Sequence, residues 1–230
     1  MLEKLKKEVW TANLELVARG LVIETWGNAS GIDRARGLVV IKPSGVAYAG
    51  MKPAHMVVVS LADGKVVEGR LKPSSDTPTH LVLYRAFQEI GGVVHTHSLY
   101  ATAWAQACKT LPSYGTTQAD YWFGDVPCTR KLKAAEIKSD YEVNTGKLIV
   151  ETFQRIDPLQ HPAVLVASHG PFTWGKNVTE AVHNAGVLEF AARLASETLR
   201  INPKTKRIEP VLLNKHFLRK HGTGAYYGQK

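Results

Sequence analysis

Two histidines separated by one residue are the first candidates for chemistry in this chain. They lie in the stretch IGGVVHTHSLYATAW, where an apolar run leads into His95 and His97. The run predicts a strand, and side chains two residues apart in a strand project from the same face. Neutral imidazole is a good ligand for zinc and for its first-row neighbours. The pair therefore indicates a metal site, although two hydrogen-bonded histidines on a half-exposed strand would give the same pattern.

A third histidine strengthens the metal interpretation. His169 follows the short apolar strand AVLVAS and precedes a Gly-Pro pair, so it lies at a strand end, where functional residues gather. Three histidines with an open position are typical of a catalytic metal, whereas a structural zinc more often uses cysteines. Asp76, at a predicted helix start, is a candidate for a fourth ligand or for a nearby base. The other histidines, such as His55, His80 and His161, lie among ordinary surface or helical residues.

Two serine-containing turns are suited to an anion. The segment KPSG places Lys42, Ser44 and Gly45 at the end of a predicted strand, and glycine permits close backbone approach. The segment KPSSD places Ser74 and Ser75 at a helix N-terminus, where free N–H groups and the helix dipole favour phosphate. Serine at a helix start is also a common cap, and neither turn matches the P-loop pattern. Together with a metal site, the two turns indicate a small phosphorylated substrate.

Helix and strand signals alternate along the whole chain and must position these side chains. No low-complexity linker or internal repeat interrupts them, so we expect one α/β domain over residues 1–230. A hairpin is expected over 56–69, with the pair Asp63-Gly64 supplying positive φ angles in its turn. Helices are expected over 2–19, 74–87, 98–107, 177–203 and 211–222. Strands are expected over 37–45, 93–97 and 163–170.

Composition and charge restrict the class of protein. A hydrophobic content of 44% with 21% charged residues is ordinary for a globular protein. The apolar runs are too short for a bilayer, the N-terminus does not resemble a secretory signal, and two cysteines make no disulfide framework. We therefore expect a cytoplasmic protein without a membrane partner. The net charge of +9 suits an anionic metabolite, because the basic residues are spread and no nucleic-acid-binding motif accompanies them.

With these residues considered together, the chain resembles the class II aldolase family over essentially its whole length. The resemblance rests on the ordered blocks TWGNAS, IKPSGVAY, KPSSDTPTH, HTHS, GTTQADY, PCTRKL, SHGPFTWGKN, AVHNA and NKHFLRKHGTGAYYGQ. It implies an α/β subunit of three layers, α/β/α, around a central, largely antiparallel sheet. It also implies a homotetramer with active sites between neighbouring subunits, to which the tail 222–230 contributes.

The resemblance also implies roles for residues at matching positions. Zinc would be held by His95, His97 and His169, with Asp76 as a further ligand or close neighbour. Asp120 and Tyr227 would be the acid/base pair. The implied substrate contacts, mainly to phosphate, are Gly27, Asn28, Lys42, Ser44, Gly45, Ser74 and Ser75. Segments that border the site in the family contribute Thr116, Glu142 and His216.

The implied activity is a zinc-dependent epimerase that interconverts L-ribulose 5-phosphate and D-xylulose 5-phosphate, in arabinose or other pentose breakdown or in L-ascorbate breakdown. The inverted carbon, C4, is not adjacent to the carbonyl, so simple deprotonation cannot invert it. Cleavage of the C3–C4 bond, rotation of the aldehyde and re-formation of the bond would require two acid/base groups, one on each face. Zinc would stabilise the enediolate as a Lewis acid.

Two other functions remain open at this stage. An aldolase of the L-fuculose-phosphate type would share the metal and phosphate sites, but it carries glutamate where this chain has Asp76. A metal-binding scaffold without catalysis, like the adducin head domain, need not keep the three histidines. The chain departs from the family's 4-epimerases at Gln118, Leu99, Tyr100 and Ala167, which puts substrate preference and rate in question.

Overall fold

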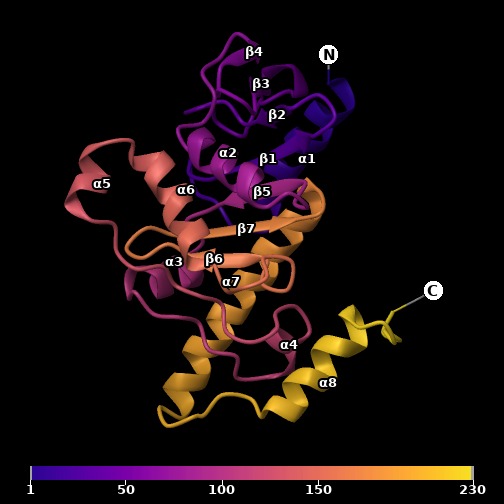
Figure 1. Cartoon of the computed structure of the whole chain (residues 1–230), viewed down its shortest axis with the longest axis vertical. Coiled ribbons are helices and arrows are strands. Elements are labelled where there is room, and N and C mark those ends of the chain that lie inside the picture. The colour runs from indigo at the N-terminus through magenta and orange to yellow at the C-terminus, as the bar shows by residue number, and fades with distance from the viewer. Residues whose placement is uncertain (1, 229–230) are drawn as a thin grey trace.

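The computed structural model describes residues 2–228, and within that range seven strands form one sheet (Figure 1). Every neighbouring pair is antiparallel, in the order β4-β3-β2-β1-β5-β7-β6. The strands are β1 (Asn28–Asp33), β2 (Leu38–Ile41), β3 (Val57–Ser60), β4 (Val66–Glu68), β5 (Gly92–His95), β6 (Ala163–Leu165) and β7 (Pro171–Gly175).

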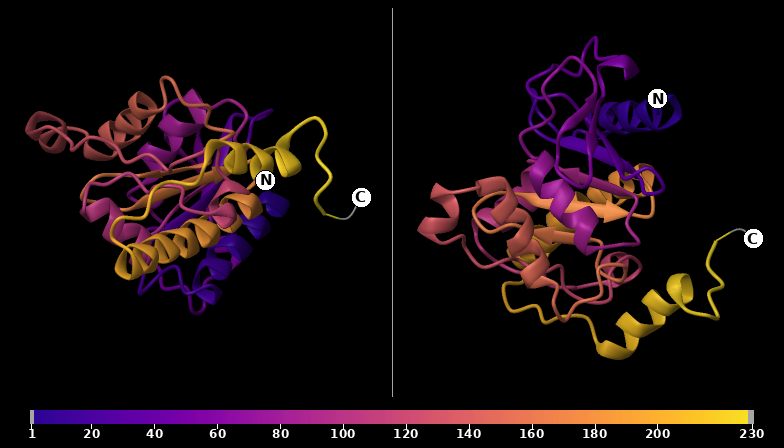
Figure 2. Two further views of the ribbon diagram at one scale, coloured as in Figure 1. Left: turned by 90° about the horizontal axis from the view of Figure 1, so that it is seen from below. Right: turned by 45° about the horizontal axis from the view of Figure 1, so that its top comes forward.

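Helices cover both faces of the sheet. Helices α1 and α7 lie against one face and α2 and α6 against the other, as the view along the layers shows (Figure 2). This arrangement confirms the expected α/β/α fold. The helices are α1 (Glu3–Ala18), η1 (Pro53–His55), α2 (Thr77–Ala86), α3 (Leu99–Gln106), α4 (Thr116–Ala119), α5 (Ala134–Lys138), α6 (Tyr141–Thr152), α7 (Val178–Ile201) and α8 (Pro210–His221). Among the described residues, none of them combines the length and apolar character that crossing a bilayer demands.

Consecutive valines explain why both faces of the sheet are covered. In β2, Val40 packs in the core beneath α1 and α7, whereas Val39 packs in the core beneath α2 and α6. In β5, Val94 and Val93 divide between the same two cores. Because successive side chains of a strand point to opposite faces, a run of buried valines requires an apolar layer on each side.

The element boundaries differ from expectation near the candidate site. Strand β5 ends at His95, so His97 lies in the link to α3 and not within the strand. The expected hairpin is present as β3 and β4, but residues 61–65 connect the strands. Only Gly64 of the pair Asp63-Gly64 has a positive φ, of 75°. The helices expected over 2–19, 98–107, 177–203 and 211–222 are present as α1, α3, α7 and α8.

Three helices between residues 116 and 152 were not expected from the sequence. Helices α4 and α5 are only 4 and 5 residues long. Helix α6 contains Gly146, a weak helix former, and a Cβ there would lie 2.7 Å from Val82 Cβ on α2. The glycine therefore permits close packing of α6 on α2, and tertiary contacts override its low helix propensity.

Candidate metal and substrate site

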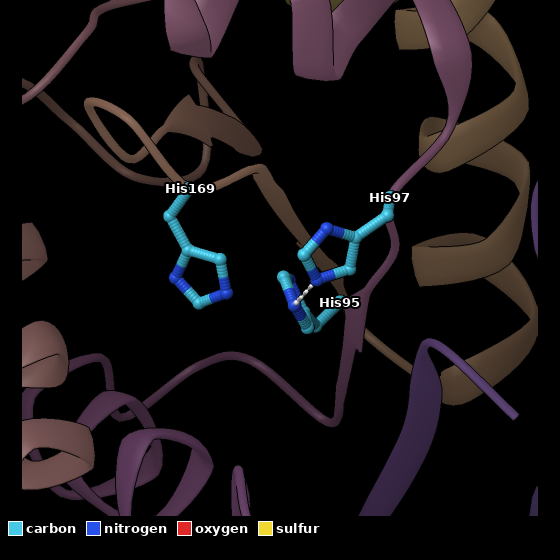
Figure 3. A group of neighbouring side chains, drawn as sticks. All are labelled: His95, His97 and His169. Carbon is cyan, nitrogen blue, oxygen red and sulfur yellow. Dashed lines mark hydrogen bonds between the residues drawn. The ribbon is translucent and has the colours of Figure 1, made fainter.

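His95, His97 and His169 converge at one end of the sheet, although they come from two separate segments (Figure 3). His95 ends β5, His97 follows two residues later, and His169 lies in the turn between β6 and β7. One ring nitrogen from each residue lies within 4.8 Å of the others, and the Nε2 atoms of His95 and His97 are 3.1 Å apart. This spacing fits one ion held between three imidazoles.

The His95 ring is fixed with its Nε2 toward this cluster. Its Nδ1 lies 2.9 Å from the carbonyl oxygen of Pro171, which can only accept, so Nδ1 carries the proton. The ring also stacks on Phe172, with centroids 4.3 Å apart. The unprotonated Nε2 is then available to a metal ion.

Burial keeps the other two histidines neutral. It lowers the pKa of His169 to about 3, and the proximity of His95 and His97 adds to the effect. Burial also lowers the pKa of His97, again with a contribution from His95. Since neutral imidazole is the form that binds metal, the three side chains fit a divalent first-row ion.

Asp76 borders the three histidines and is held by an amide. Asn28 donates from Nδ2 to Asp76 Oδ2 at 2.7 Å and to the Ser74 hydroxyl at 3.0 Å. Burial tends to raise the pKa of Asp76, but His95, His80 and the Asn28 amide together lower it below its ordinary value. Asp76 is therefore a carboxylate at neutral pH. Among residues 2–228, the side chains whose ligand atoms lie close enough together to share one ion are His95, His97 and His169, and this group does not include Asp76.

The two serine turns lie side by side. The backbone N–H of Ser44 donates to Lys72 O at 2.9 Å, and that of Ser74 donates to Lys42 O at 3.0 Å. Gly45 has a φ of 65°, which is favourable for glycine and strained for other residues. Two segments that are distant in the sequence therefore lie against each other, joined by these two backbone hydrogen bonds.

One pocket of about 390 Å³ joins the histidines to the serine turns. Asn28 Oδ1 is buried there and has no hydrogen-bond partner within the described residues, so a ligand hydroxyl could satisfy it. The predicted site residues that line the pocket are Gly27, Asn28, Lys42, Ser44, Gly45, Ser74, Ser75, Asp76, His95, His97, Glu142 and His169. The pocket can therefore bind a metal ion at one part and an anion at another.

The remaining predicted residues lie in a second cluster, formed by α4 and α8. Thr116 begins α4 and Asp120 follows its end. Arg219 donates to both carboxylate oxygens of Asp120, at 3.0 and 2.7 Å. His216 Nδ1 lies 3.1 Å from Asp120 Oδ1, and the Arg219 guanidinium lies 4.6 Å from the centre of the Tyr227 ring. Within residues 2–228, none of these side chains lines the histidine pocket.

The side chains around Asp120 in this second cluster favour its ionised form. Burial tends to raise the pKa of Asp120, but hydrogen bonds from Arg219 and His216 and the charge of Lys220 lower it overall. Tyr227 is 58% exposed, so its phenol is accessible on the surface of this chain. Of the predicted tail 222–230, Gln229 and Lys230 lie outside the described residues.

Comparison with known proteins supports a family assignment. A sequence profile of the Class II Aldolase and Adducin N-terminal domain matches residues 7–196. The chain belongs to the class II aldolase and adducin family. Within this family, the L-ribulose-5-phosphate 4-epimerase UlaF of Salmonella paratyphi B is 59% identical over 229 residues, which cover 100% of both chains. The protein of the same name from Salmonella typhi is also 59% identical over 100% of both chains.

Solved structures of class II aldolases share the fold. An L-fuculose 1-phosphate aldolase is 26% identical, with a TM-score of 0.78 over 93% of this chain and 94% of that chain. The l-fuculose-1-phosphate aldolase from Thermus thermophilus has a TM-score of 0.69 over 88% of this chain and 99% of that chain, at 22% identity. The second similarity is evidence for the fold alone.

The pocket also contains residues that were not predicted as site residues, namely Thr25, Trp26, Pro43 and Tyr141. All four carried a sequence signal. Thr25 and Trp26 lie within the block TWGNAS, Pro43 lies within the block IKPSGVAY, and Tyr141 directly precedes the predicted Glu142. Tyr141 in addition contacts a histidine of the cluster, since its hydroxyl lies 3.4 Å from His169 Nδ1.

The residues at which the sequence was expected to depart from the family's 4-epimerases do not line the pocket within residues 2–228. Gln118 is buried and donates from Nε2 to Gly124 O at 3.2 Å, so it links the ends of a loop. Ala167 is also buried, and its backbone N–H donates to the Thr129 hydroxyl at 3.0 Å. Leu99 is 73% exposed, and nothing in the structure explains its identity.

Proposed function

We propose that the protein is a zinc-dependent epimerase that interconverts L-ribulose 5-phosphate and D-xylulose 5-phosphate. The observation that carries this proposal is one pocket lined both by three histidines with closely spaced ring nitrogens and by the two serine turns. The full-length identity of 59% to relatives named L-ribulose-5-phosphate 4-epimerase supports the same substrate. Class II aldolases are typically metal-dependent, which supports the role of the histidines.

Zinc would be held by His95, His97 and His169, with the Asp76 carboxylate beside them. A bound zinc ion supplies a Lewis acid that stabilises negative charge developing on oxygen. The protein's own contribution is to keep the His97 and His169 imidazoles neutral by burial, which lowers their pKa values, and to fix the His95 ring through the Pro171 carbonyl. Asn28 holds Asp76 through its Nδ2, and its unpartnered Oδ1 could accept a hydrogen bond from a substrate hydroxyl.

The substrate phosphate would bind at the two serine turns. Ser44, Ser74, Ser75 and Lys42 line this part of the pocket. Lys42 is only 2% exposed, and a buried ammonium of this kind gains from an anionic partner. The backbone at Gly45 allows the phosphate to approach closely.

Asp120 and Tyr227 would move protons on opposite faces of C4. One group removes the proton of the C4 hydroxyl while the C3–C4 bond breaks, and the bonding pair remains with the three-carbon fragment as an enediolate. The products of this step are the enediolate of dihydroxyacetone and glycolaldehyde phosphate. After the aldehyde rotates, the enediolate attacks its other face, and the second group protonates the new C4 oxygen.

The separation of the two clusters in one chain supports a site completed by a second copy. Asp120, His216 and Tyr227 lie beside α8, whereas the histidines and serine turns lie in the pocket. A neighbouring subunit in a homotetramer would supply the acid/base groups to the pocket. Closed cyclic assemblies repeat one such heterologous contact around a ring.

The test is to incubate the purified protein with L-ribulose 5-phosphate and to separate the products. We expect D-xylulose 5-phosphate, with loss of turnover on chelation and recovery with a divalent metal. Accumulation of free dihydroxyacetone without D-xylulose 5-phosphate would favour the second candidate, an aldolase, to which the 26% identical L-fuculose 1-phosphate aldolase points. Full activity in protein shown to be metal-free would refute the role of zinc.

A further inference from the structure

Tyr141 contacts a histidine of the cluster whose ring has no hydrogen bond to the backbone within the described residues. Its hydroxyl lies 3.4 Å from His169 Nδ1, and the two ring centroids are 6.1 Å apart. His95, in contrast, is held by the carbonyl of Pro171. Tyr141 is the first residue of α6 and also lines the pocket.

The Tyr141 hydroxyl can accept from or donate to His169 Nδ1, and a metal ion bound at Nε2 would make Nδ1–H the donor. A neutral imidazole carries one N–H, and only the other nitrogen can bind a metal ion. If Nδ1–H donates to the Tyr141 oxygen, the lone pair is on Nε2. Histidines that bind metals usually donate their other N–H to a nearby acceptor, which fixes both the tautomer and the ring orientation.

The start of α6 is held in place from the α2 side. Thr79 on α2 donates from its hydroxyl to Glu142 O at 2.7 Å, and Thr145 donates to Tyr141 O at 2.9 Å. Gly146 packs closely against Val82, as its Cβ would lie 2.7 Å from Val82 Cβ. These contacts limit movement of the Tyr141 backbone.

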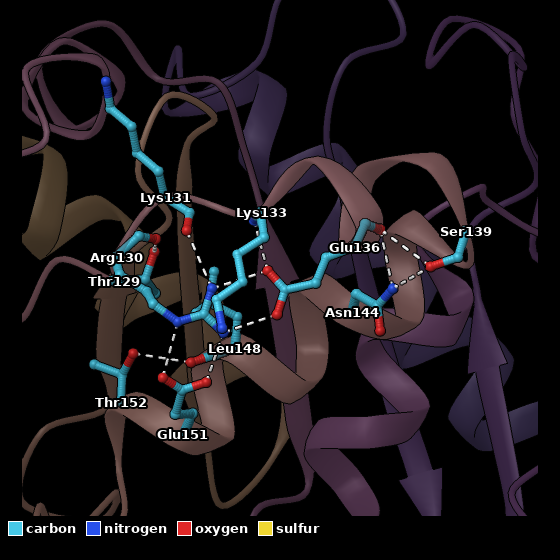
Figure 4. Close-up of polar contacts among 10 residues, drawn as sticks. All are labelled: Thr129, Arg130, Lys131, Lys133, Glu136, Ser139, Asn144, Leu148, Glu151 and Thr152. Atoms are coloured by element: carbon cyan, nitrogen blue, oxygen red, sulfur yellow. Dashed lines mark hydrogen bonds and ion pairs between the residues drawn. The ribbon is translucent and has the colours of Figure 1, made fainter.

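An arginine clamp joins α6 to α5 (Figure 4). Arg130 donates to both carboxylate oxygens of Glu136 on α5, at 2.9 and 2.8 Å, and to both of Glu151 on α6, at 2.9 and 2.7 Å. Asn144 on α6 donates to Glu136 O at 2.9 Å, so α5 and α6 are joined directly as well. A planar guanidinium that pairs with two carboxylates fixes their relative orientation better than an ammonium would.

We propose that Tyr141 is a positioning residue that orients His169 for metal binding, and that the clamp of Arg130, Glu136 and Glu151 holds Tyr141 in place. This inference rests on the proposed function, because it requires that the histidines bind a metal ion. It adds a connected set of contacts from the surface clamp through α6 to His169.

The test measures metal affinity directly and not through turnover. Apo protein is titrated with zinc against a chromophoric chelator, and the visible absorption of bound cobalt reports the ligand geometry. Tyr141→Phe should weaken zinc binding by about tenfold and alter the cobalt spectrum. Urea unfolding of both proteins confirms that the variant is folded.

Tyr121→Phe is the matched control. The Tyr121 hydroxyl also contacts a histidine, lying 3.3 Å from His183 Nε2, but neither residue lines the pocket. This variant should bind zinc like the unchanged protein. Equal affinities and cobalt spectra for Tyr141→Phe and the control would overturn the inference. Absence of zinc binding by the unchanged protein would instead overturn the proposed function, and this inference with it.

The clamp is tested by a double-mutant cycle. Arg130→Met should weaken zinc binding when Tyr141 is present and have no further effect in Tyr141→Phe, because both changes release the same ring. Arg130→Lys, which keeps the charge without the planar fork, should resemble Arg130→Met. Equal losses from Arg130→Met in both backgrounds would show that the clamp does not act through Tyr141.

Discussion

At the scale of single residues, two buried polar groups of the pocket residues have fewer hydrogen bonds to the protein than buried polar groups usually have. Asn28 Oδ1 has no hydrogen-bond partner within residues 2–228. Lys42 Nζ lies 3.4 Å from Pro43 O and 4.7 Å from the centre of the Tyr48 ring. An unsatisfied buried group costs about 1–3 kcal/mol, and a bound substrate could recover this free energy.

Lys42 provides a prediction about the balance between binding and stability. Lys42→Met should raise the KM for the phosphorylated substrate by about tenfold, because a charge-assisted hydrogen bond to phosphate is lost. The free energy of unfolding of the ligand-free protein should rise by about 1 kcal/mol, because burial lowers the pKa of Lys42 and so opposes its charged form. Steady-state kinetics and urea denaturation measure the two quantities. Lys65→Met, at an exposed residue, is the control; a fall in stability for Lys42→Met alone would contradict the prediction.

His97 provides a prediction about the metal ligands. His97→Gln should lower both bound zinc and turnover by more than about 100-fold, since even changes to the hydrogen-bond partners of metal ligands cost about 10–100-fold. Elemental analysis of the purified protein measures the zinc, and product formation measures the turnover. His55→Gln changes a histidine outside the pocket and should retain both. Zinc retained at full occupancy in His97→Gln would exclude this residue as a ligand.

The sequence alone predicts some residues of the two clusters better than others. Strand geometry suggested that His95 and His97 share one face, and the place of His169 at a strand end suggested a functional role for it. The contact of Asp120 with Arg219 joins residues 99 positions apart, and no periodicity relates them. Only the family resemblance suggested a role for Asp120, and no pattern in the sequence indicated that a guanidinium pairs with it.

At the scale of elements, the position of α6 depends on ionised side chains. Arg130 lowers the pKa of Glu136 to about 2, from an ordinary value of 4.5, mainly through its hydrogen bonds. A depressed pKa means that the contact of α5 with Arg130 is fully present above pH 4.5 and is lost as the pH falls through about 2. Acid should therefore release α5 from the clamp.

This prediction is measured by NMR titration of the Glu136 side chain. The carboxyl group should titrate near pH 2 in the unchanged protein. In Arg130→Met it should titrate closer to the ordinary value of 4.5, because the main cause of the shift is removed. Titration near the ordinary value in both proteins would show that Arg130 and Glu136 do not pair in solution.

Elements were predictable where one local signal dominates. The valine runs of β2, β3 and β5 agree with the structure, and so does the start of α7, where Asn177 Oδ1 accepts from the Glu180 N–H at 2.9 Å. The sequence predicted that β5 ends at His97, because threonine and histidine both occur in strands. In the structure, pairing with β1 and β7 stops at His95. Helix α6 was missed because its stability comes from packing on α2 and not from propensity.

At the scale of the whole molecule, the question is whether one chain or two neighbouring chains supply the two clusters of one site. The pocket of one chain contains the candidate metal ligands and anion-binding turns, and the α4/α8 cluster contains the candidate acid/base groups. In one chain Asp120 is paired with Arg219 on α8, and within residues 2–228 neither side chain lines the pocket. A second copy could supply the cluster intact. The sequence could indicate this only through the family resemblance, because no single-chain pattern encodes a contact between copies.

Mixing two inactive variants distinguishes the arrangements. His97→Gln disables the pocket and Asp120→Asn disables the second cluster, so each protein alone should have little epimerase activity. If the site joins the pocket of one chain to the α4/α8 cluster of its neighbour, random reassembly of equal amounts should leave about a quarter of the sites with both parts intact. The measurement is activity after joint unfolding and refolding, with each variant refolded alone as the control. If each chain completes its own site, every chain in the mixture retains one defect and no activity returns.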